Sequence, residues 1–402
     1  MQVYWASLFI LPKKVIDQVE QNLRRFLWTG TEMKKSGAKV AWKDVTLPKE
    51  VGGLGIKKVS EWNLAANFKH LWNLIQPHSK SPWVQWVKIN LLKRKHLWEI
   101  KRPPECSWIW GKLLKLRDRF KTLVQHIVGN GMSTSLWFDQ WLPEGSIWDR
   151  MGERVIYDSG LPREATVSSI IQSSKWCWPI ANSPHLMDLK ENMPANPCAN
   201  NPDQVRWLPS SSGVFTICSA WNCIRTRNQK TNWWRFPNSI PTCSFVLWMA
   251  IREKLNTQDR ILSYGGIPSM SCVFCAQPVE SHDHLFFQCI FTKELWLHLL
   301  ARCELVWIED NWQHTIEWAR TKLCGKTLKH YIGKLVFSIT VYTIWLERNR
   351  RTFAHEHKDM PRLITDIQNL VKGRLMGARG FPRSTMHLRL QSMWGLHDGI
   401  YI

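Results

Sequence analysis

Apolar residues recur at every third or fourth position over much of this chain, which is the spacing of amphipathic helices. In residues 12–28 the repeating positions are Val15, Val19, Leu23 and Phe26. The same spacing predicts helices over residues 60–76, 107–120, 243–255, 292–303 and 363–375. The longest apolar run, residues 335–346, is too short to cross a bilayer and is interrupted by hydroxyl side chains, so it predicts a buried helix.

Alternation with a period of two is scarce in the sequence. Residues 205–217, interrupted by Ser-Ser-Ser-Gly at 210–213, predict a β-hairpin. Gly52, Gly53 and Gly55 predict a tight loop, and residues 131–212 are predicted to be an irregular connector. The predicted fold class is therefore mainly α with short β-hairpins (α+β), in a chain of several parts.

Basic residues gather at the two ends of the chain. The 402 residues contain 54 Lys and Arg against 32 Asp and Glu, a net charge of +22. Residues 1–130 hold 24 basic and nine acidic residues, and residues 301–402 hold 16 and nine. A chain this basic is expected to bind polyanions by neutralising phosphates and releasing counterions, so RNA or DNA is the expected partner.

The N-terminal third mixes these cations with tryptophan, which the chain uses 26 times. Such a mixture can offer cations to phosphates and rings to stacked bases, although core packing is the usual role of tryptophan. A solvated charged face is the alternative for each cation. The candidates for phosphate contacts are Lys34, Lys35, Lys39, Lys57, Lys58, Lys93, Arg94 and Lys95.

One cluster of cysteine and histidine has the spacing of a metal site. Cys272, Cys275, His284 and Cys289 form a Cys-x2-Cys-x8-His-x4-Cys array within eighteen residues. Three thiolates and one imidazole are a complete tetrahedral ligand set for one structural Zn²⁺, with no open position for catalysis. His282 competes with His284 for the fourth place, and small buried thiols are the alternative for the cysteines.

The other cysteines have no such spacing, and the total of 11 is odd. Residues 1–11 are apolar but lack the basic start and small-residue cleavage site of a signal peptide. These features favour free thiols in a reducing compartment, with the protein in the nucleus or cytoplasm and no membrane partner.

Several segments, in this order along the chain, carry a family resemblance. They are Tyr-Trp-Ala-Ser-Leu-Phe at 4–9, Leu-Pro-Lys-Glu-Val-Gly-Gly-Leu-Gly at 47–55, Gly-Asn-Gly at 129–131, Trp-Phe-Asp-Gln-Trp at 137–141, His-Leu-Phe-Phe-Gln-Cys at 284–289 with Glu280, and Trp-Leu-Glu-Arg-Asn-Arg-Arg-Thr-Phe at 345–353. Together they resemble the C-terminal part of plant LINE-type (non-LTR) retrotransposon reverse transcriptases, which contains a reverse-transcriptase zinc-binding domain.

The resemblance implies a division into four parts. Residues 1–130 resemble the end of the reverse-transcriptase domain, 131–212 are the connector, 213–300 resemble the zinc-binding domain, and 301–402 form a C-terminal helical region. The family polymerase holds its metal ions on an Asp-Asp turn, and this sequence contains no Asp-Asp dipeptide. The chain is expected to begin after the polymerase palm and to end without the ribonuclease H domain of many relatives.

The function expected from these observations is non-catalytic binding of zinc and of nucleic acid without sequence specificity, and the chain is not expected to be an enzyme. A full-length reverse transcriptase acting in trans is a further expected partner. Two alternatives remain open, namely a protein-interaction or structural zinc module, and the product of a decayed element with no selected function.

Overall fold

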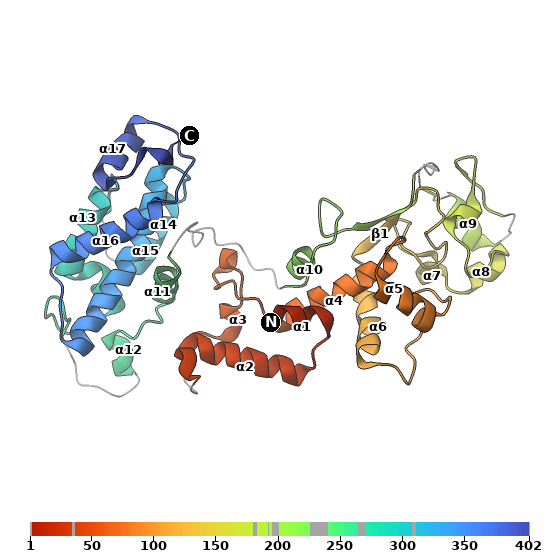
Figure 1. Cartoon of the computed structure of the whole chain (residues 1–402), viewed down its shortest axis with the longest axis horizontal. Coiled ribbons are helices and arrows are strands. Elements are labelled where there is room, and N and C mark those ends of the chain that lie inside the picture. The colour runs from red at the N-terminus through yellow and green to blue at the C-terminus, as the bar shows by residue number, and fades with distance from the viewer. Residues whose placement is uncertain are drawn as a thin grey trace. The chain divides into compact units, whose positions relative to one another are not determined.

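The computed structural model describes residues 2–33, 37–179, 183–191, 193–194, 201–225, 240–263, 271–307 and 311–401 (Figure 1). The chain forms two compact units. Unit 1 consists of Met1–Lys34 and Lys57–Arg227, and unit 2 consists of Lys35–Ile56 and Asn228–Ile402. This division differs from the four parts expected from the sequence, because residues 35–56 and 131–212 join different neighbours.

Unit 1 is mainly helical. Its helices are α1 (Gln2–Leu8), α2 (Lys13–Thr29), α4 (Val59–Ile75), α5 (Pro82–Val87), α6 (Trp108–Lys121), α7 (Ile147–Met151), α8 (Arg154–Ser159), α9 (Pro184–Glu191) and α10 (Ile217–Ile224), with short turns η1 (Gly30–Glu32), η3 (Lys88–Leu92) and η4 (Val167–Ile170). The helices predicted over 12–28, 60–76 and 107–120 are confirmed as α2, α4 and α6.

Helix α4 lies at the centre of unit 1, where α1, α2, α6 and α10 contact it. Its buried Asn63 ends the N-terminal helix, because its side chain donates to the carbonyl oxygens of Ala6 at 2.7 Å and Phe9 at 2.6 Å. The same side chain accepts the amide of Leu11 at 3.0 Å. A buried polar side chain of α4 thus satisfies backbone groups that α1 leaves unpaired at its end.

The core of unit 1 is rich in aromatic rings. Phe68 of α4, Phe120 of α6 and Trp207 pack together, with ring centroids 5.2 to 6.5 Å apart. Residues 131–212, predicted to be an irregular connector, include the short helices α7, α8 and α9 and are part of this core, since Trp137, Phe138 and others of them are fully or nearly fully buried in it.

Two buried carboxylates hold the irregular loop at residues 129–139. Asp203 accepts hydrogen bonds from the amides of Gly129 and Gly131, both at 2.8 Å, and of Ser133 at 2.9 Å. Asp139 accepts the amide of Ser135 at 2.8 Å. A β-carbon at Gly129 would lie 2.1 Å from a backbone oxygen, so only glycine lets the loop approach this closely.

The Asp139 carboxylate has three ring partners. The Trp98 indole donates to it at 3.0 Å, and His126 and His96 each place a ring nitrogen within 3.5 Å of it. Burial alone would raise the pKa of Asp139, but the two histidines and the Ser135 amide outweigh it and hold the pKa well below its ordinary value.

The strands of unit 1 are short and antiparallel. Strand β1 (Val124–Ile127) pairs with β4 (Gln204–Trp207), and β2 (Ile171–Gln172) pairs with β3 (Lys175–Trp176). The hairpin predicted at 205–217 is wrong, because its first strand pairs with β1, and residues 214–216 form no strand and lead into helix α10. Thr216 and Ser219 cap that helix in a reciprocal capping box.

Unit 2 is mainly helical. Its helices are α3 (Trp42–Val45), α11 (Pro241–Ile251), α12 (Gln258–Ser263), α13 (Ile290–Ala301), α14 (Trp312–Lys322), α15 (Leu328–Asn349), α16 (Met360–Leu375) and α17 (Thr385–Trp394), with turns η2 (Lys49–Val51), η6 (His284–Gln288), η7 (Arg350–Ala354) and η8 (Asp398–Ile400). The buried helix predicted at 335–346 is the middle of α15, which α11, α13, α16 and α17 contact. No helix in the described ranges is both long and apolar enough to cross a membrane.

Residues 37–56 contact the rest of unit 2 through the predicted glycine loop. The Gly52 carbonyl accepts the Trp248 indole at 2.9 Å and the Arg252 guanidinium at 2.7 Å, both from the end of α11. At Gly53 a β-carbon would lie 1.9 Å from the Leu47 carbonyl oxygen. The glycine motif therefore serves a tight turn that presents one carbonyl to α11.

Candidate metal centre

The four residues of the Cys-His array come together in unit 2. Their ligand atoms, three Sγ and one imidazole nitrogen, all lie within 4.8 Å of one another. Cys275 Sγ is 3.2 Å from His284 Nε2, and Cys272 Sγ is 4.0 Å from Cys289 Sγ. Sulfur ligands about 2.3 Å from a tetrahedral zinc lie roughly 3.8 Å apart, so the set fits one zinc ion.

Local structure explains how each ligand reaches this point. Cys272 and Cys275 sit on a turn closed by the bond from the Ala276 amide to the Cys272 carbonyl, 2.8 Å long. His284 begins the π-helical turn η6, and Cys289 follows that turn directly and caps α13. Two short structures, a loop turn and a helix junction, thus converge on one site.

The two most buried thiols form a hydrogen-bonded pair. The bond between Cys272 and Cys289 raises the pKa of Cys272 far above its ordinary value and lowers that of Cys289, and burial adds to the rise at Cys272. A metal ion that replaces the shared proton must therefore bind with release of protons, as thiolate sites do.

The structure separates the two histidines that the spacing leaves open. His284 lies in the cluster, whereas His282 is buried against the rings of Phe286 and Trp312, 5.2 and 5.1 Å away. Neither ring nitrogen of His282 has a hydrogen-bond partner among the described residues. Burial lowers the pKa of His282 to about 4, so this imidazole is a neutral part of the core.

A buried ion pair fixes the metal loop to the long helix α15. Glu280 and Arg348 are 0% and 2% exposed, and the guanidinium donates to both carboxylate oxygens at 2.9 to 3.1 Å. Glu280 also accepts the amide of Gln258 at 3.3 Å. Two of the segments that carry the family resemblance in this unit, around Glu280 and at 345–353, are therefore in direct contact.

Arg351 makes a second connection between the same elements. Its guanidinium lies 4.7 Å from the Phe274 ring and 4.9 Å from the Phe291 ring, and it pairs with Glu347 at 2.9 Å. Phe274 is inside the Cys-x2-Cys turn, so the cation–π contact holds the turn that presents two of the ligands. The sequence signal for both connections is the i, i+3 spacing of Arg348 and Arg351, which places them on one helix face.

The structure describes six of the eight candidate phosphate ligands, five of them in unit 1. Lys93, Arg94 and Lys95 are exposed neighbours in unit 1 and line one pocket. Lys57 lies 3.3 Å from the centre of the Trp62 ring and is engaged in a cation–π contact, and Lys58 is half-buried beside it.

The structure describes one of the remaining three candidates. Lys39 is an exposed residue of unit 2, and partial burial and the nearby Arg260 lower its pKa. Lys34 and Lys35 lie outside the described residues. Sequence reasoning missed Arg163 and Ser135, which share the pocket of residues 93–95 from a distant part of the chain.

Comparison with known proteins adds to this geometry. Residues 215–296 match the protein family described as zinc-binding in reverse transcriptase. The chain is 24% identical over 347 residues to an Arabidopsis thaliana protein named "Putative ribonuclease H protein", covering 77% of this chain and 53% of that protein. It is 26% identical over 144 residues to an uncharacterized mitochondrial protein of the same plant, covering 35% of this chain and 92% of that protein. No solved structure matches the chain.

These similarities confirm the resemblance to a retrotransposon protein related to reverse transcriptases. The alignment spans about half the length of the first relative. The matched domain is a zinc-binding one, and the three cysteines and His284 could hold one zinc ion. That these four side chains are the ligands is a prediction that metal analysis tests.

Proposed function

We propose that this chain is a zinc-stabilised, nucleic-acid-binding part of a LINE-type reverse-transcriptase-like protein, without catalysis of its own. The observation that carries the binding role is the exposed run Lys93, Arg94 and Lys95, which has no ion-pair partner among the described residues. It belongs to the most basic third of the chain. Unpaired cations on a basic surface favour phosphate as the ligand.

Zinc has a structural role in this proposal. When bound, it supplies folding energy to the loop of residues 272–289, which Glu280 and Arg351 connect to α15. The four protein ligands complete a tetrahedral shell, and a complete shell offers no position to a substrate. Together with the lack of an Asp-Asp dipeptide in the sequence, this supports a binding rather than a catalytic role.

The proposed partners follow from the chemistry of the cations. Lysine and arginine contacts to phosphates carry no sequence information, so RNA or DNA is bound without sequence specificity. A full-length reverse transcriptase in trans is a further proposed partner. The nucleus is the proposed compartment, with the cytoplasm as the alternative.

A protein-docking module is the second candidate function. Helix α2 exposes 59% of Phe26 and 39% of Val15, so its apolar stripe is only partly covered within unit 1. An exposed apolar surface of this kind is typical of an interaction site. It also fits a decayed product whose partner domain is lost.

Salt dependence distinguishes these functions. We expect the zinc-loaded chain to bind single-stranded RNA and DNA with an affinity that falls steeply with salt, by a slope of about −0.7 per phosphate contact on a log–log plot. The measurement is fluorescence anisotropy at several salt concentrations. Weak binding that salt does not change would reject the nucleic-acid role and favour protein docking.

A further inference from the structure

The pocket beside residues 93–95 has the chemistry of a phosphate site. Its volume is about 430 Å³, within the range of about 300–1,000 Å³ that is usual for ligand sites. Four cationic side chains, two carboxylates and three hydroxyl groups line it. The lining includes Lys93, Arg94, Lys95, Arg163, Ser135 and Glu164.

Only one of the four cations in this pocket is paired with an acidic side chain. Arg163 is paired with Glu99 at 2.8 Å and with Glu153 at 2.6 Å, so it and Glu99 contribute little net charge. Within the described part of the chain, Lys93, Arg94 and Lys95 have no acidic partner. Glu164 is exposed and opposes them, which leaves an excess of positive charge in the pocket.

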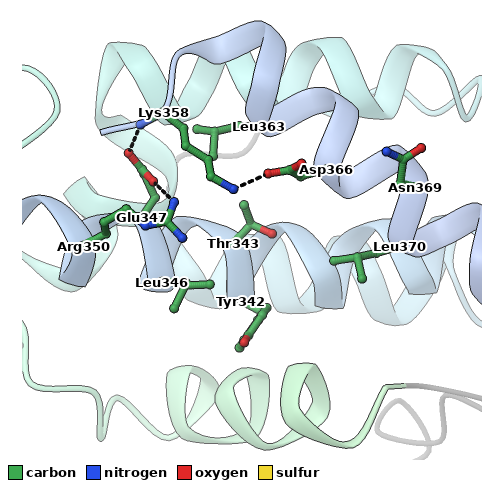
Figure 2. Close-up of a pocket in the computed structure, with 10 residues that line it drawn as sticks. All are labelled: Tyr342, Thr343, Leu346, Glu347, Arg350, Lys358, Leu363, Asp366, Asn369 and Leu370. Atoms are coloured by element: carbon green, nitrogen blue, oxygen red, sulfur yellow. Dashed lines mark hydrogen bonds and ion pairs between the residues drawn. The ribbon is translucent and has the colours of Figure 1, made fainter. Parts of the chain in front are cut away.

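A second pocket that contains cations differs in this respect. Figure 2 shows the pocket between α15 and α16, where Arg350 pairs with Glu347 at 3.1 Å and Lys358 pairs with Asp366 at 2.6 Å. Its cations are therefore already used within the protein. An anion would have to break these pairs to bind there, whereas no such cost applies to Lys93, Arg94 and Lys95.

The walls of the basic pocket are held rigidly. Ser135 accepts the Phe138 amide at 3.3 Å through its oxygen, a bond that does not use the hydroxyl hydrogen. Its own amide is bound by the buried Asp139. Among the cations of the lining, Lys93 and Arg94 have φ values of 46° and 71°, a left-handed conformation that is uncommon for such side chains and clusters at functional sites.

We propose that this pocket binds one phosphate group of a nucleic-acid strand, through the cations Lys93, Arg94 and Lys95 together with the Ser135 hydroxyl. The inference rests on the proposed nucleic-acid function and adds a defined site to it. The phosphate is either the terminal group of a strand or an internal phosphodiester, since both present the same anionic oxygens.

The test compares charge changes inside and outside the pocket in the full chain with zinc bound. The pocket variant is Arg94→Glu/Lys95→Glu, and its control is Lys13→Glu/Lys14→Glu on α2, which changes the net charge equally at exposed positions. The probe is a short single-stranded RNA, once with a 5′-phosphate and once with a 5′-hydroxyl. Binding is followed by fluorescence anisotropy, and circular dichroism checks that each variant is folded.

We expect the pocket variant to lose about tenfold or more in affinity, because charge-assisted bonds to a phosphate are lost, and the control to lose clearly less. Glu164→Gln should bind more tightly than wild type. A preference for the 5′-phosphate identifies a terminal group, and equal binding of both RNAs identifies an internal one.

Equal losses in the pocket and control variants, with no gain in Glu164→Gln, would overturn the pocket while leaving the proposed function in place. Failure of the wild-type chain to bind either RNA would overturn both.

Discussion

The loops at residues 129–139 of unit 1 and 272–289 of unit 2 are held in place by different side chains. Both have irregular backbone whose polar groups need partners. In unit 1 the partners are two buried carboxylates, Asp139 and Asp203, which accept backbone amides directly. In unit 2 three thiols and an imidazole converge on one point, and the ion pair of Glu280 and Arg348 holds their loop.

The loop of unit 1 therefore finds all its partners within the chain, whereas the loop of unit 2 depends on a metal ion from solution. The carboxylates of unit 1 are satisfied as soon as that unit folds. Without a metal ion the thiols of unit 2 share protons or, when ionised, repel one another. The stability of unit 2 therefore varies with the zinc concentration by mass action. Hydrogen exchange read by mass spectrometry reports on the two loops separately.

The largest expected effect is loss of the metal. Cys272→Ser/Cys275→Ser should abolish zinc binding and expose the loop at 272–289 to exchange, since structural zinc contributes about 10–16 kcal/mol of apparent binding energy in small zinc domains. The loop at 129–139 should keep its protection. Cys324→Ser, an exposed cysteine of unit 2, is the control. Metal content is measured by mass spectrometry, and a folded wild type without zinc would contradict the assignment.

The next largest effect is expected from the buried ion pair. Arg348→Met leaves Glu280 charged and buried without its partner, which should cost about 3–5 kcal/mol in the free energy of unfolding measured with denaturant. Adding Glu280→Met should restore most of that loss, because two apolar side chains replace two charges. A double variant no more stable than Arg348→Met would show that the pair acts through other contacts, such as the Gln258 amide.

A smaller effect is expected from the carboxylate of unit 1. Asp203→Asn turns one acceptor oxygen into a donor that faces backbone amides. It should lower the free energy of unfolding by about 1–3 kcal/mol. Exchange should rise at residues 129–133, and zinc content should stay at the wild-type value. Asp118→Asn, at a side chain that is 83% exposed, is the matched control. A rise in exchange at 272–289 instead would break the proposed independence of the two loops.

The smallest expected effect is the pH dependence of the stability lost in Asp203→Asn. Burial raises the pKa of Asp203, but the bonds from the amides of Gly129, Ser133 and Gly131 outweigh it and lower the pKa below its ordinary value. The stabilisation is therefore fully present above about pH 4, the unfolded value, and is lost as pH falls further. The gap between wild type and Asp203→Asn should narrow below pH 4 in acid unfolding followed by tryptophan fluorescence. A gap that widens in acid would reject this sign.

Local spacing explains which features the sequence could predict. The four predicted metal ligands lie within eighteen residues, and helices such as α4 and α6 repeat their apolar positions every turn, so both could be predicted from the pattern. The His-x4-Cys spacing also favours His284 over His282, but it does not exclude His282. The separation of the two histidines depends on the π-helical turn and on the rings that enclose His282.

Features formed by distant residues could not be predicted. Strand β4 pairs with β1 rather than with its own neighbour, and the local pattern of residues 205–217 contains no trace of that partner. Asp203 is 74 residues from Gly129, and Arg348 is 68 residues from Glu280. The motif at 137–141 contains Asp139, but nothing in the motif shows that its carboxylate contacts two histidines and an indole.

The docking of Gly52 on Trp248 has a consequence for how the protein is made. The two residues are 196 positions apart, so residues 35–56 leave the ribosome long before the helix that receives them. At about 5–20 residues per second, the wait is roughly 10 to 40 seconds. During this time the ribosome synthesises most of unit 1, although residues 35–56 belong to unit 2. Unit 2 therefore completes its fold only late in translation, with one piece of it exposed to chaperones and proteases until then.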